Sequence, residues 1–446
     1  NYIDGDWVES KSEQTLDIVN PSTSEVLGRV PLSGASEVAD AVKAAKEAFW
    51  SWRTTPAVRR SRYMYRLKDV MEENFEEITQ RTVMEAGKTM DESRGELRRA
   101  IEMVEVACGI PSLMMGRCLE DVSRGIDCAA NRQPMGVLAA ITPYNVPTMV
   151  PFWFWPFAVA CGNTFLVKPS EQDPLTQQYL FELIDEEVGF PPGVLNMVHG
   201  GKEAVTSILD HPDIEGVSLV GSSTVARIVY DGCGRTGKRV QALGGAKNFL
   251  VVMPDANLEE SVANIVASAY GCAGQRCLAA STIVAVGDVY DKIKDALVKA
   301  AGDLKVGYGL DESVQMGPVI SKAHQKNVLG YIETGIEEGA ELILDGRNIQ
   351  VEGCEDGAFV GPTIFDKVKP EMTIAKEEIF GPVLGIIHVD TFDEAVEIIR
   401  NNPYGNAGSI YTESGKWARE FGYRVESSML GINIGIPVII GWIDAF

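Results

Sequence analysis

Apolar residues in the first part of the chain follow a helical period. In residues 37–50 and 58–86 they recur every three or four positions between acidic and basic ones, as in amphipathic helices. The pattern stays mostly helical to about residue 121. It predicts that helices dominate this part of the fold.

Farther along, short apolar runs alternate with helical stretches. The runs lie at residues 136–141, 164–167, 194–198, 217–220, 249–253, 282–286, 340–344 and 383–388. Such alternation is typical of parallel α/β sheets, whose strands are buried on both faces. We predict an α/β protein with two domains, one from residues 1–118 and 136–245 and the other from residues 246–446.

Two segments depart from this alternation. Residues 119–135 are polar and lack a helical period, so they are predicted to project from the first domain as a hairpin. Residues 150–167 form the most apolar stretch, but Pro151, Pro156 and Gly162 interrupt it. A helix that spans a bilayer needs about 20 consecutive, predominantly apolar residues. The stretch is therefore predicted to lie in the core.

Composition narrows the classes of partner. With 446 residues, of which 45% are hydrophobic, the chain can bury a large core. Its formal charge of −23 disfavours nucleic acid and anionic membranes as partners, because both are negative. Eight irregularly spaced cysteines without a CxxC pair, and four histidines, fit neither a disulfide framework nor a zinc site. We expect no metal site and a reducing, cytoplasmic location, or the mitochondrial matrix in a eukaryote.

The first candidate for chemistry is the sequence GCAGQRC at residues 271–277. A single cysteine is more often a small buried apolar residue than a nucleophile. Here Gly271 and Gly274 predict a turn that presents a side chain, and Arg276 places a positive charge beside Cys277, which would favour its thiolate. Cys272 has no such basic neighbour and is expected to be structural. We therefore select Cys277 as the candidate nucleophile.

Five other motifs lie next to predicted strands. They are TPYNVP (142–147), KPSE (168–171), GSST (221–224), ALGG (242–245) and EEIFGPV (377–383). Roles in turns or helix caps would explain most of them individually. In GSST, however, Gly221 and Ser222 open a helix whose exposed N–H groups could also bind a pyrophosphate. A strict GxGxxG motif is absent after this strand.

Together these motifs resemble the aldehyde dehydrogenase superfamily, from about residue 18 to residue 433. The resemblance is closest to the CoA-acylating methylmalonate-semialdehyde dehydrogenase branch, on motifs at residues 237–242, 245–248, 252–257, 274–277, 402–406 and 435–438. Leu243 and Gly244 depart from that branch, which usually has Asn-Met. The resemblance implies a Rossmann-type NAD-binding domain, an α/β catalytic domain and an oligomerisation hairpin at residues 119–135, whose C-terminal partner strand this chain lacks. It also implies a homodimer or homotetramer.

The resemblance assigns the catalytic roles. Cys277 would attack an aldehyde, hydride would pass to NAD, and a thioester would be left on the enzyme. The side-chain amide of Asn145 and the backbone N–H of Cys277 would form the oxyanion hole.

Four further residues would bind the cofactor. The resemblance places Lys168 and Glu171 at the adenosine ribose, and a carboxylate beside the 2′-hydroxyl favours NAD over NADP. It places Glu378 and Phe380 at the nicotinamide ribose and ring.

Position 242 decides the second half of the reaction. The resemblance places there the glutamate that activates water, and this chain has alanine. Hydrolysis of a thioester at neutral pH needs such a base, whereas a thiol with a pKa of about 8.5 is already a few per cent thiolate. Gln241 cannot substitute, because an amide is not a useful base. We therefore expect coenzyme A as co-substrate.

The expected substrate is malonate or methylmalonate semialdehyde, with decarboxylation. The resemblance places Arg99 in the same pocket as Arg276, and two guanidinium groups would hold a carboxylate by charge-assisted hydrogen bonds. Arg99 could equally be one of several arginines on an exposed helix face. Two other functions stay open: a hydrolytic NAD(P)-dependent enzyme that uses another base, and a catalytically silent structural relative.

Overall fold

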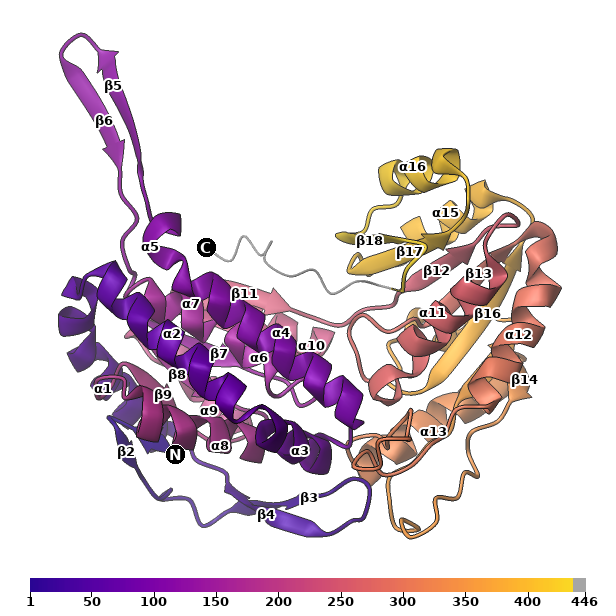
Figure 1. The fold of residues 1–446 in the computed structure, drawn as a ribbon, viewed down its shortest axis with the longest axis horizontal. Helices are drawn as coiled ribbons and strands as arrows, with labels where there is room; N and C mark the ends of the chain where they lie inside the picture. Colours follow the sequence, from indigo (N-terminus) through magenta and orange to yellow (C-terminus); the bar gives the residue numbers. More distant parts are fainter. Residues whose placement is uncertain (436–446) are drawn as a thin grey trace.

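The computed structural model describes residues 1–435, which form two seven-stranded sheets, each covered by helices (Figure 1). The first sheet has the strand order β11-β10-β7-β8-β9-β1-β2. Its strands are β1 (Tyr2–Ile3), β2 (Asp6–Trp7), β7 (Val137–Ile141), β8 (Thr164–Lys168), β9 (Leu195–Met197), β10 (Ile214–Val220) and β11 (Arg239–Leu243). Strands β7 to β11 are parallel, and β1 pairs antiparallel with β9 and β2. Every residue of β7, β8 and β9 is buried, as their continuous apolar runs predict.

The second sheet has the order β14-β15-β16-β13-β12-β17-β18. Its strands are β12 (Phe249–Val252), β13 (Thr282–Val286), β14 (Glu341–Leu344), β15 (Thr363–Asp366), β16 (Val383–Val389), β17 (Ala407–Tyr411) and β18 (Met429–Ile432). All neighbours are parallel except β14, which pairs antiparallel with β15. The two sheets draw on residues on either side of position 245, and the division into domains there stays a prediction. Residues 436–446, which end the predicted second domain and hold most of the motif at 435–438, lie outside the described residues.

Helices cover both sheets. Those with the first sheet are α1 (Ala35–Thr54), α2 (Ala57–Glu73), α3 (Phe75–Ala86), α4 (Met90–Cys108), α5 (Ile110–Leu113), α6 (Met149–Phe152), α7 (Trp155–Ala160), α8 (Leu175–Leu183), α9 (Lys202–Asp210) and α10 (Ser223–Thr236). Those with the second are α11 (Leu258–Tyr270), α12 (Tyr290–Gly302), α13 (Lys322–Glu337), α14 (Thr373–Lys376), α15 (Phe392–Arg400) and α16 (Gly415–Arg424). Three short helical turns of other types lie at Ile184–Val188, Gly271–Gly274 and Gly287–Val289.

The beginning of the chain corrects one expectation. Residues 1–31, predicted to be mostly helical, form β1, β2 and the hairpin of β3 (Thr15–Val19) and β4 (Val26–Pro31). These strands are two to six residues long. A period cannot show over so short a length, and the strands are fixed by pairing, with Tyr2 opposite the distant Met197.

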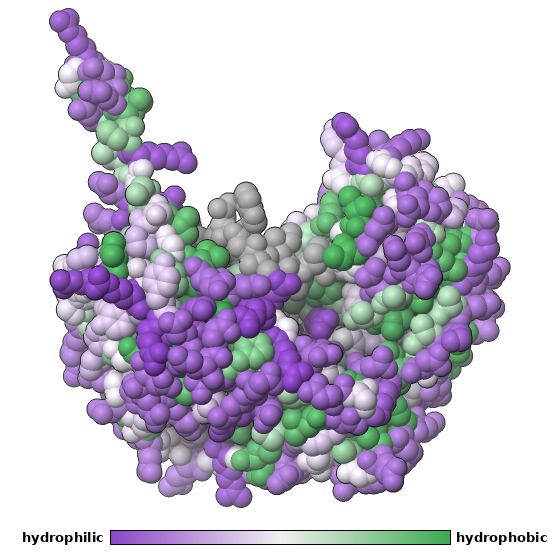
Figure 2. All heavy atoms as spheres, in the orientation of Figure 1, coloured by the Kyte–Doolittle hydropathy of each residue, from purple (hydrophilic) through white to green (hydrophobic). Residues whose placement is uncertain are grey.

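An exposed hairpin projects from the body of the molecule (Figure 1). It consists of β5 (Arg117–Ser123) and β6 (Ile126–Ala130), and every residue of both strands is exposed. Leu119, Val122 and Ile126 are each more than half exposed, and apolar side chains are visible along this arm (Figure 2). The apolar stretch at residues 150–167 holds α6, α7 and β8 and is nearly all buried, as predicted. Within residues 1–435, no helix combines the length and apolar character that crossing a membrane requires.

Candidate active site

The loop that carries Cys277 depends on an unusual backbone turn. After α11, Cys272 and Ala273 both have φ of 51° and Gly274 has φ of 73°, in the left-handed region. A Cβ atom on Gly274 would lie 2.2 Å from the carbonyl oxygen of Gly381. Only glycine permits this approach, which brings the loop of Cys277 against the segment 377–383.

Two asparagine side chains fix the backbone at Cys277. The Nδ2 groups of Asn248 and Asn406 donate to the Cys277 carbonyl oxygen at 2.9 and 3.0 Å. Asn248 Nδ2 also donates to the carbonyl of Ala279 at 2.9 Å. Both asparagines belong to longer sequence motifs, which by themselves indicate no role for either residue. Their amide type suits a carbonyl acceptor, but no local pattern identifies the partner.

Asn145 lies against the same loop. It is buried, and its Nδ2 donates to the carbonyl of Gln275 at 2.9 Å, two residues before Cys277. An amide nitrogen carries two N–H donors, so a second remains to meet a developing oxyanion. The structure thus brings together the two residues that the resemblance assigns to the oxyanion hole.

Glu378 and Phe380 complete the cluster of loops. A Cβ atom on Gly245 would lie 2.4 Å from Glu378 Oε2, so Gly245 makes room for this carboxylate. Phe380 has φ of 58°, a strained conformation for an aromatic residue. Its carbonyl oxygen lies 2.8 Å from His324 Nε2, and its ring packs edge-to-face with that of Tyr144 at 6.0 Å. Tyr144 immediately precedes Asn145, so these contacts join the segments 142–147 and 377–383.

Burial and charge both act on the Cys277 thiol. The pKa of Cys277 is raised to about 11, chiefly by burial and also by the carboxylate of Glu378, against the smaller lowering effects of backbone N–H groups and Arg276. Burial also raises the pKa of Glu378, against the lowering by the Ala246 N–H and the charge of Lys247. In this state the thiol is therefore protonated at neutral pH. Arg276 lowers the pKa of Cys277, in the expected direction, but by less than burial raises it.

Arg276 interacts with a different cysteine. Its Nε donates to Cys272 Sγ at 3.2 Å, and its Nη2 lies 3.8 Å from Glu92 Oε1. The expectation that Cys272 lacks a basic neighbour is therefore wrong. The side chain of Arg276 folds back over its own turn, and a Cβ atom on Gly271 would lie 2.5 Å from its Nη1. Arg276 is next to Cys277 in the sequence, but the left-handed turn at residues 272–274 brings its guanidinium to Cys272.

The residues predicted to bind the adenosine and pyrophosphate lie at the carboxyl ends of two strands. Lys168, buried at the end of β8, donates to Glu171 Oε2 at 2.7 Å. After β10, Gly221 donates its N–H to the carbonyl of Leu243 at 3.0 Å, and Ser222 caps α10 by accepting the Val225 N–H at 3.4 Å. β8 and β10 flank β7, which leads to Asn145. Ligands of open α/β sheets bind at such strand ends.

Arg99 lies on α4 and forms an ion pair with Glu102, with 2.9 Å between Nη1 and Oε2. It follows Glu92 by seven residues and Glu96 by three, so the three share one helix face. Glu92 accepts the N–H of Cys272, and Glu96 accepts the N–H groups of Thr148 and Met149. The face of α4 that carries Arg99 is therefore turned towards the loops of Cys277 and Asn145. The structure records no contact between Arg99 and Arg276 among the described residues.

Position 242 offers no base, and no cluster of metal ligands is found among the described residues. Ala242 lies in β11, an edge strand of the first sheet, and supplies no ionisable group. In the part of the chain that the structure describes, His, Cys, Asp and Glu side chains form no group of three or more that could hold a metal ion, and all eight cysteines are free.

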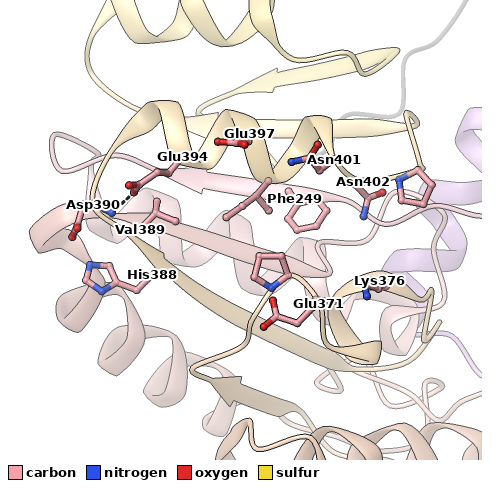
Figure 3. A pocket seen from close by; sticks show the side chains of 14 residues that line it. Phe249, Glu371, Lys376, His388, Val389, Asp390, Glu394, Glu397, Asn401 and Asn402 are labelled. Atoms are coloured by element: carbon pink, nitrogen blue, oxygen red, sulfur yellow. Dashed lines mark hydrogen bonds between the residues drawn. The ribbon is translucent and has the colours of Figure 1, made fainter.

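A separate hollow lies on the second sheet's side of the molecule, between β16 and α15 (Figure 3). Its lining includes Phe249, Lys376, His388, Asp390, Glu394 and Asn401. None of the site residues predicted from the sequence lies in this hollow, so the candidate active site is the loop cluster around Cys277. On the face seen in Figure 2, the surface is hollowed between the two sheet-bearing lobes.

The fold and the loop cluster define an α/β protein of two mainly parallel sheets, with a buried candidate nucleophile among the loops. The chain belongs to the aldehyde dehydrogenase family, whose family model matches residues 7–440.

Several relatives of similar length bear the names of semialdehyde dehydrogenases. A malonate-semialdehyde dehydrogenase of Geobacillus kaustophilus is 48% identical, over 100% of this chain and 93% of the relative. A malonate-semialdehyde dehydrogenase of Halalkalibacterium halodurans is 46% identical, over the same shares. A solved Sinorhizobium meliloti structure, assigned as a methylmalonate-semialdehyde dehydrogenase complexed with NAD, has a TM-score of 0.97 and 41% identity. The match covers 99% of this chain and 90% of that one.

We predict that Glu378→Gln lowers the pKa of Cys277, because it removes a negative charge that opposes the thiolate. The rate of alkylation by iodoacetamide, measured against pH without cofactor, follows the thiolate and rises about tenfold per pH unit below the pKa. The variant should therefore react faster than the wild type at pH 8. Identical pH profiles would show that Glu378 does not act on the thiol.

Proposed function

We propose that this protein catalyses the NAD-dependent oxidation of a short semialdehyde to its acyl-CoA. Malonate or methylmalonate semialdehyde is the substrate, and decarboxylation gives acetyl- or propionyl-CoA. The observation that carries the proposal is Ala242, which stands where the family resemblance places the water-activating glutamate. The chain keeps Cys277, and Asn145 donates to the carbonyl of Gln275 in the same loop. The names of the relatives support the class of substrate.

The residues present fit NAD. Glu171 follows β8 and supplies a carboxylate for the ribose hydroxyls, with Lys168 beside it. Gly221 and Ser222 lead into α10, whose first N–H groups suit a pyrophosphate, and Gly245 leaves space beside the Glu378 carboxylate. NAD, when bound, accepts the hydride. Under this proposal Glu378 and Phe380 hold the nicotinamide end near Cys277.

The chemistry of this chain's own residues follows from their positions. The Cys277 thiol, protonated in this state, first releases its proton to solvent and then attacks the carbonyl carbon of the aldehyde as a thiolate. The Asn145 amide and the Cys277 N–H stabilise the oxyanion. Loss of hydride leaves a thioester on Cys277. The thiol of CoA is a strong nucleophile and needs less help from a base than water does. An active site with alanine at position 242 can therefore still release its acyl group.

One observation favours a second function, a hydrolytic aldehyde dehydrogenase. The carboxylate of Glu378 is close enough to Cys277 to raise its pKa, and its own pKa is raised by burial. A carboxylate with these properties could serve as the base that activates water. A catalytically silent relative is disfavoured by the presence of Cys277, Asn145 and Glu378.

The acceptor can be identified by the time course of NADH formation. With CoA we expect steady turnover. Without CoA we expect a burst of about one NADH per active site and then a slow phase, because the acyl-enzyme accumulates. Ala242→Glu should raise the slow CoA-free rate, and Cys277→Ala should abolish both phases. Rapid turnover of the wild type without CoA would favour the hydrolytic enzyme instead.

The substrate carboxylate is proposed to bind Arg99 and Arg276. We predict that Arg99→Leu lowers kcat/KM for malonate semialdehyde by about tenfold or more, the loss of one charge-assisted hydrogen bond of about 1.5 kcal/mol. The kcat/KM for uncharged propanal should hardly change. Equal losses with both aldehydes would mean that Arg99 supports the fold or the cofactor site.

We propose that the protein is a homodimer or homotetramer assembled through the hairpin of β5 and β6. Its proposed location is the cytoplasm, or the mitochondrial matrix in a eukaryote. Leu119, Val122 and Ile126 expose apolar surface on this hairpin that a second copy would cover. Sedimentation velocity should show a dimer or tetramer for the wild type and a smaller species for Leu119→Lys combined with Ile126→Lys. A wild-type monomer at micromolar concentration would contradict the proposal.

A further inference from the structure

Arg276 is held on two sides. Cys272 Sγ accepts its Nε–H at 3.2 Å, and Glu92 Oε1 lies 3.8 Å from its Nη2. Gly271 leaves the space that the guanidinium occupies, since a Cβ atom there would lie 2.5 Å from Nη1. A guanidinium is planar and has five N–H donors. With the Nε edge directed to Cys272, the terminal Nη groups are the donors that can meet a carboxylate.

Glu92 is itself fixed, by the start of α4. Its Oε2 accepts the N–H of Thr89 at 3.0 Å, and its own N–H donates to Thr89 Oγ1 at 3.3 Å, which forms a capping box. The positive end of the helix dipole also favours a carboxylate in this first turn. The Glu92 side chain is only 11% exposed. Its position therefore depends on the helix and not on Arg276.

Glu92 also holds the turn that carries Cys272. Its Oε1 accepts the Cys272 N–H at 2.5 Å, and Cys272 has the left-handed φ of 51° that a non-glycine residue adopts only at a cost. α4 packs with the helices of the first sheet, whereas this turn leads into the second. One carboxylate thus connects the helix of Arg99 with the loop of Arg276 and Cys277.

We propose that Glu92 and Cys272 are positioning residues that set the enzyme's selectivity for acidic aldehydes. They hold the Arg276 guanidinium so that its Nη groups face the substrate carboxylate on the same side as Arg99. This inference rests on the proposed function, because it concerns how a semialdehyde carboxylate is recognised. Neither residue touches the reacting atoms, so their loss affects the binding of acidic substrates and leaves the chemical step in place.

The test compares kcat and KM for malonate semialdehyde and propanal, with saturating NAD and CoA. Glu92→Gln removes the charge beside Arg276, and its single amide oxygen can accept only one of the two N–H groups that Glu92 accepts, that of Cys272 or that of Thr89. Cys272→Ala removes the acceptor of the Nε–H, and Cys272→Ser restores an acceptor. Asp91→Asn is the matched control, because Asp91 is an exposed carboxylate in the same first turn of α4.

We expect Glu92→Gln and Cys272→Ala each to raise KM for malonate semialdehyde about fivefold or more, the loss of about 1 kcal/mol in one hydrogen bond, while kcat and the activity on propanal stay within about twofold. Cys272→Ser and Asp91→Asn should behave as the wild type. In an Arg276→Leu background, Glu92→Gln should cause no further loss of selectivity, because both changes act through one guanidinium.

Activity on propanal reports whether each variant is folded. Equal losses on both aldehydes would overturn the inference in favour of a structural role. Unchanged selectivity in Glu92→Gln and Cys272→Ala, with a wild type that prefers malonate semialdehyde, would overturn the inference alone. A wild type without that preference would overturn the proposed substrate class as well.

Discussion

The contact between Gly274 and the carbonyl of Gly381 determines how the site is built. A Cβ atom at position 274 would stand 2.2 Å from that oxygen, so the approach exists only because the residue is glycine. It brings the loop of Cys277 against the segment that carries Glu378 and Phe380. The strained φ angles of Cys272, Ala273 and Phe380 lie on either side of this contact. Strain of this kind persists only where the surroundings hold it, here through the bonds that Glu92 and His324 make to the two segments.

The same approach places a carboxylate near the thiol. Glu378 raises the pKa of a cysteine that burial already keeps protonated. The Ala246 N–H and the positive charge of Lys247 stabilise the Glu378 carboxylate and lower its pKa. Burial lowers the pKa of Lys247 itself to about 8. The reactivity of Cys277 therefore depends on where the Glu378 carboxylate points and on whether it is ionised. Under its proposed role at the nicotinamide ribose, one side chain would link the cofactor to the state of the nucleophile.

How far the sequence predicts this structure depends on whether the signal is local. The runs of β7, β8 and β13 are continuous and apolar because both faces of these strands are buried. Such a run can be recognised in the sequence without knowing which strands lie beside it. β17 has the sequence AGSIY, whose small residues hide an equally buried strand. The loops of Cys277, Asn145 and Glu378 could be identified by motif. The partner of Arg276 could not, because it depends on the left-handed φ of Cys272, which no composition rule predicts.

A change at position 242, which is proposed to decide whether water or CoA accepts the acyl group, requires little change in the fold. Ala242 sits in β11, an edge strand held to β10 by parallel backbone pairing, with Leu219 opposite it. That pairing uses backbone groups and is indifferent to whether the side chain is a methyl group or a carboxylate. Under the proposed function, the residues that bind the aldehyde and form the thioester come from other loops, which do not require the side chain at 242. Under the proposed function, a framework that assembles the first half of the reaction is therefore kept intact while the second half changes through a single, partly buried side chain of β11.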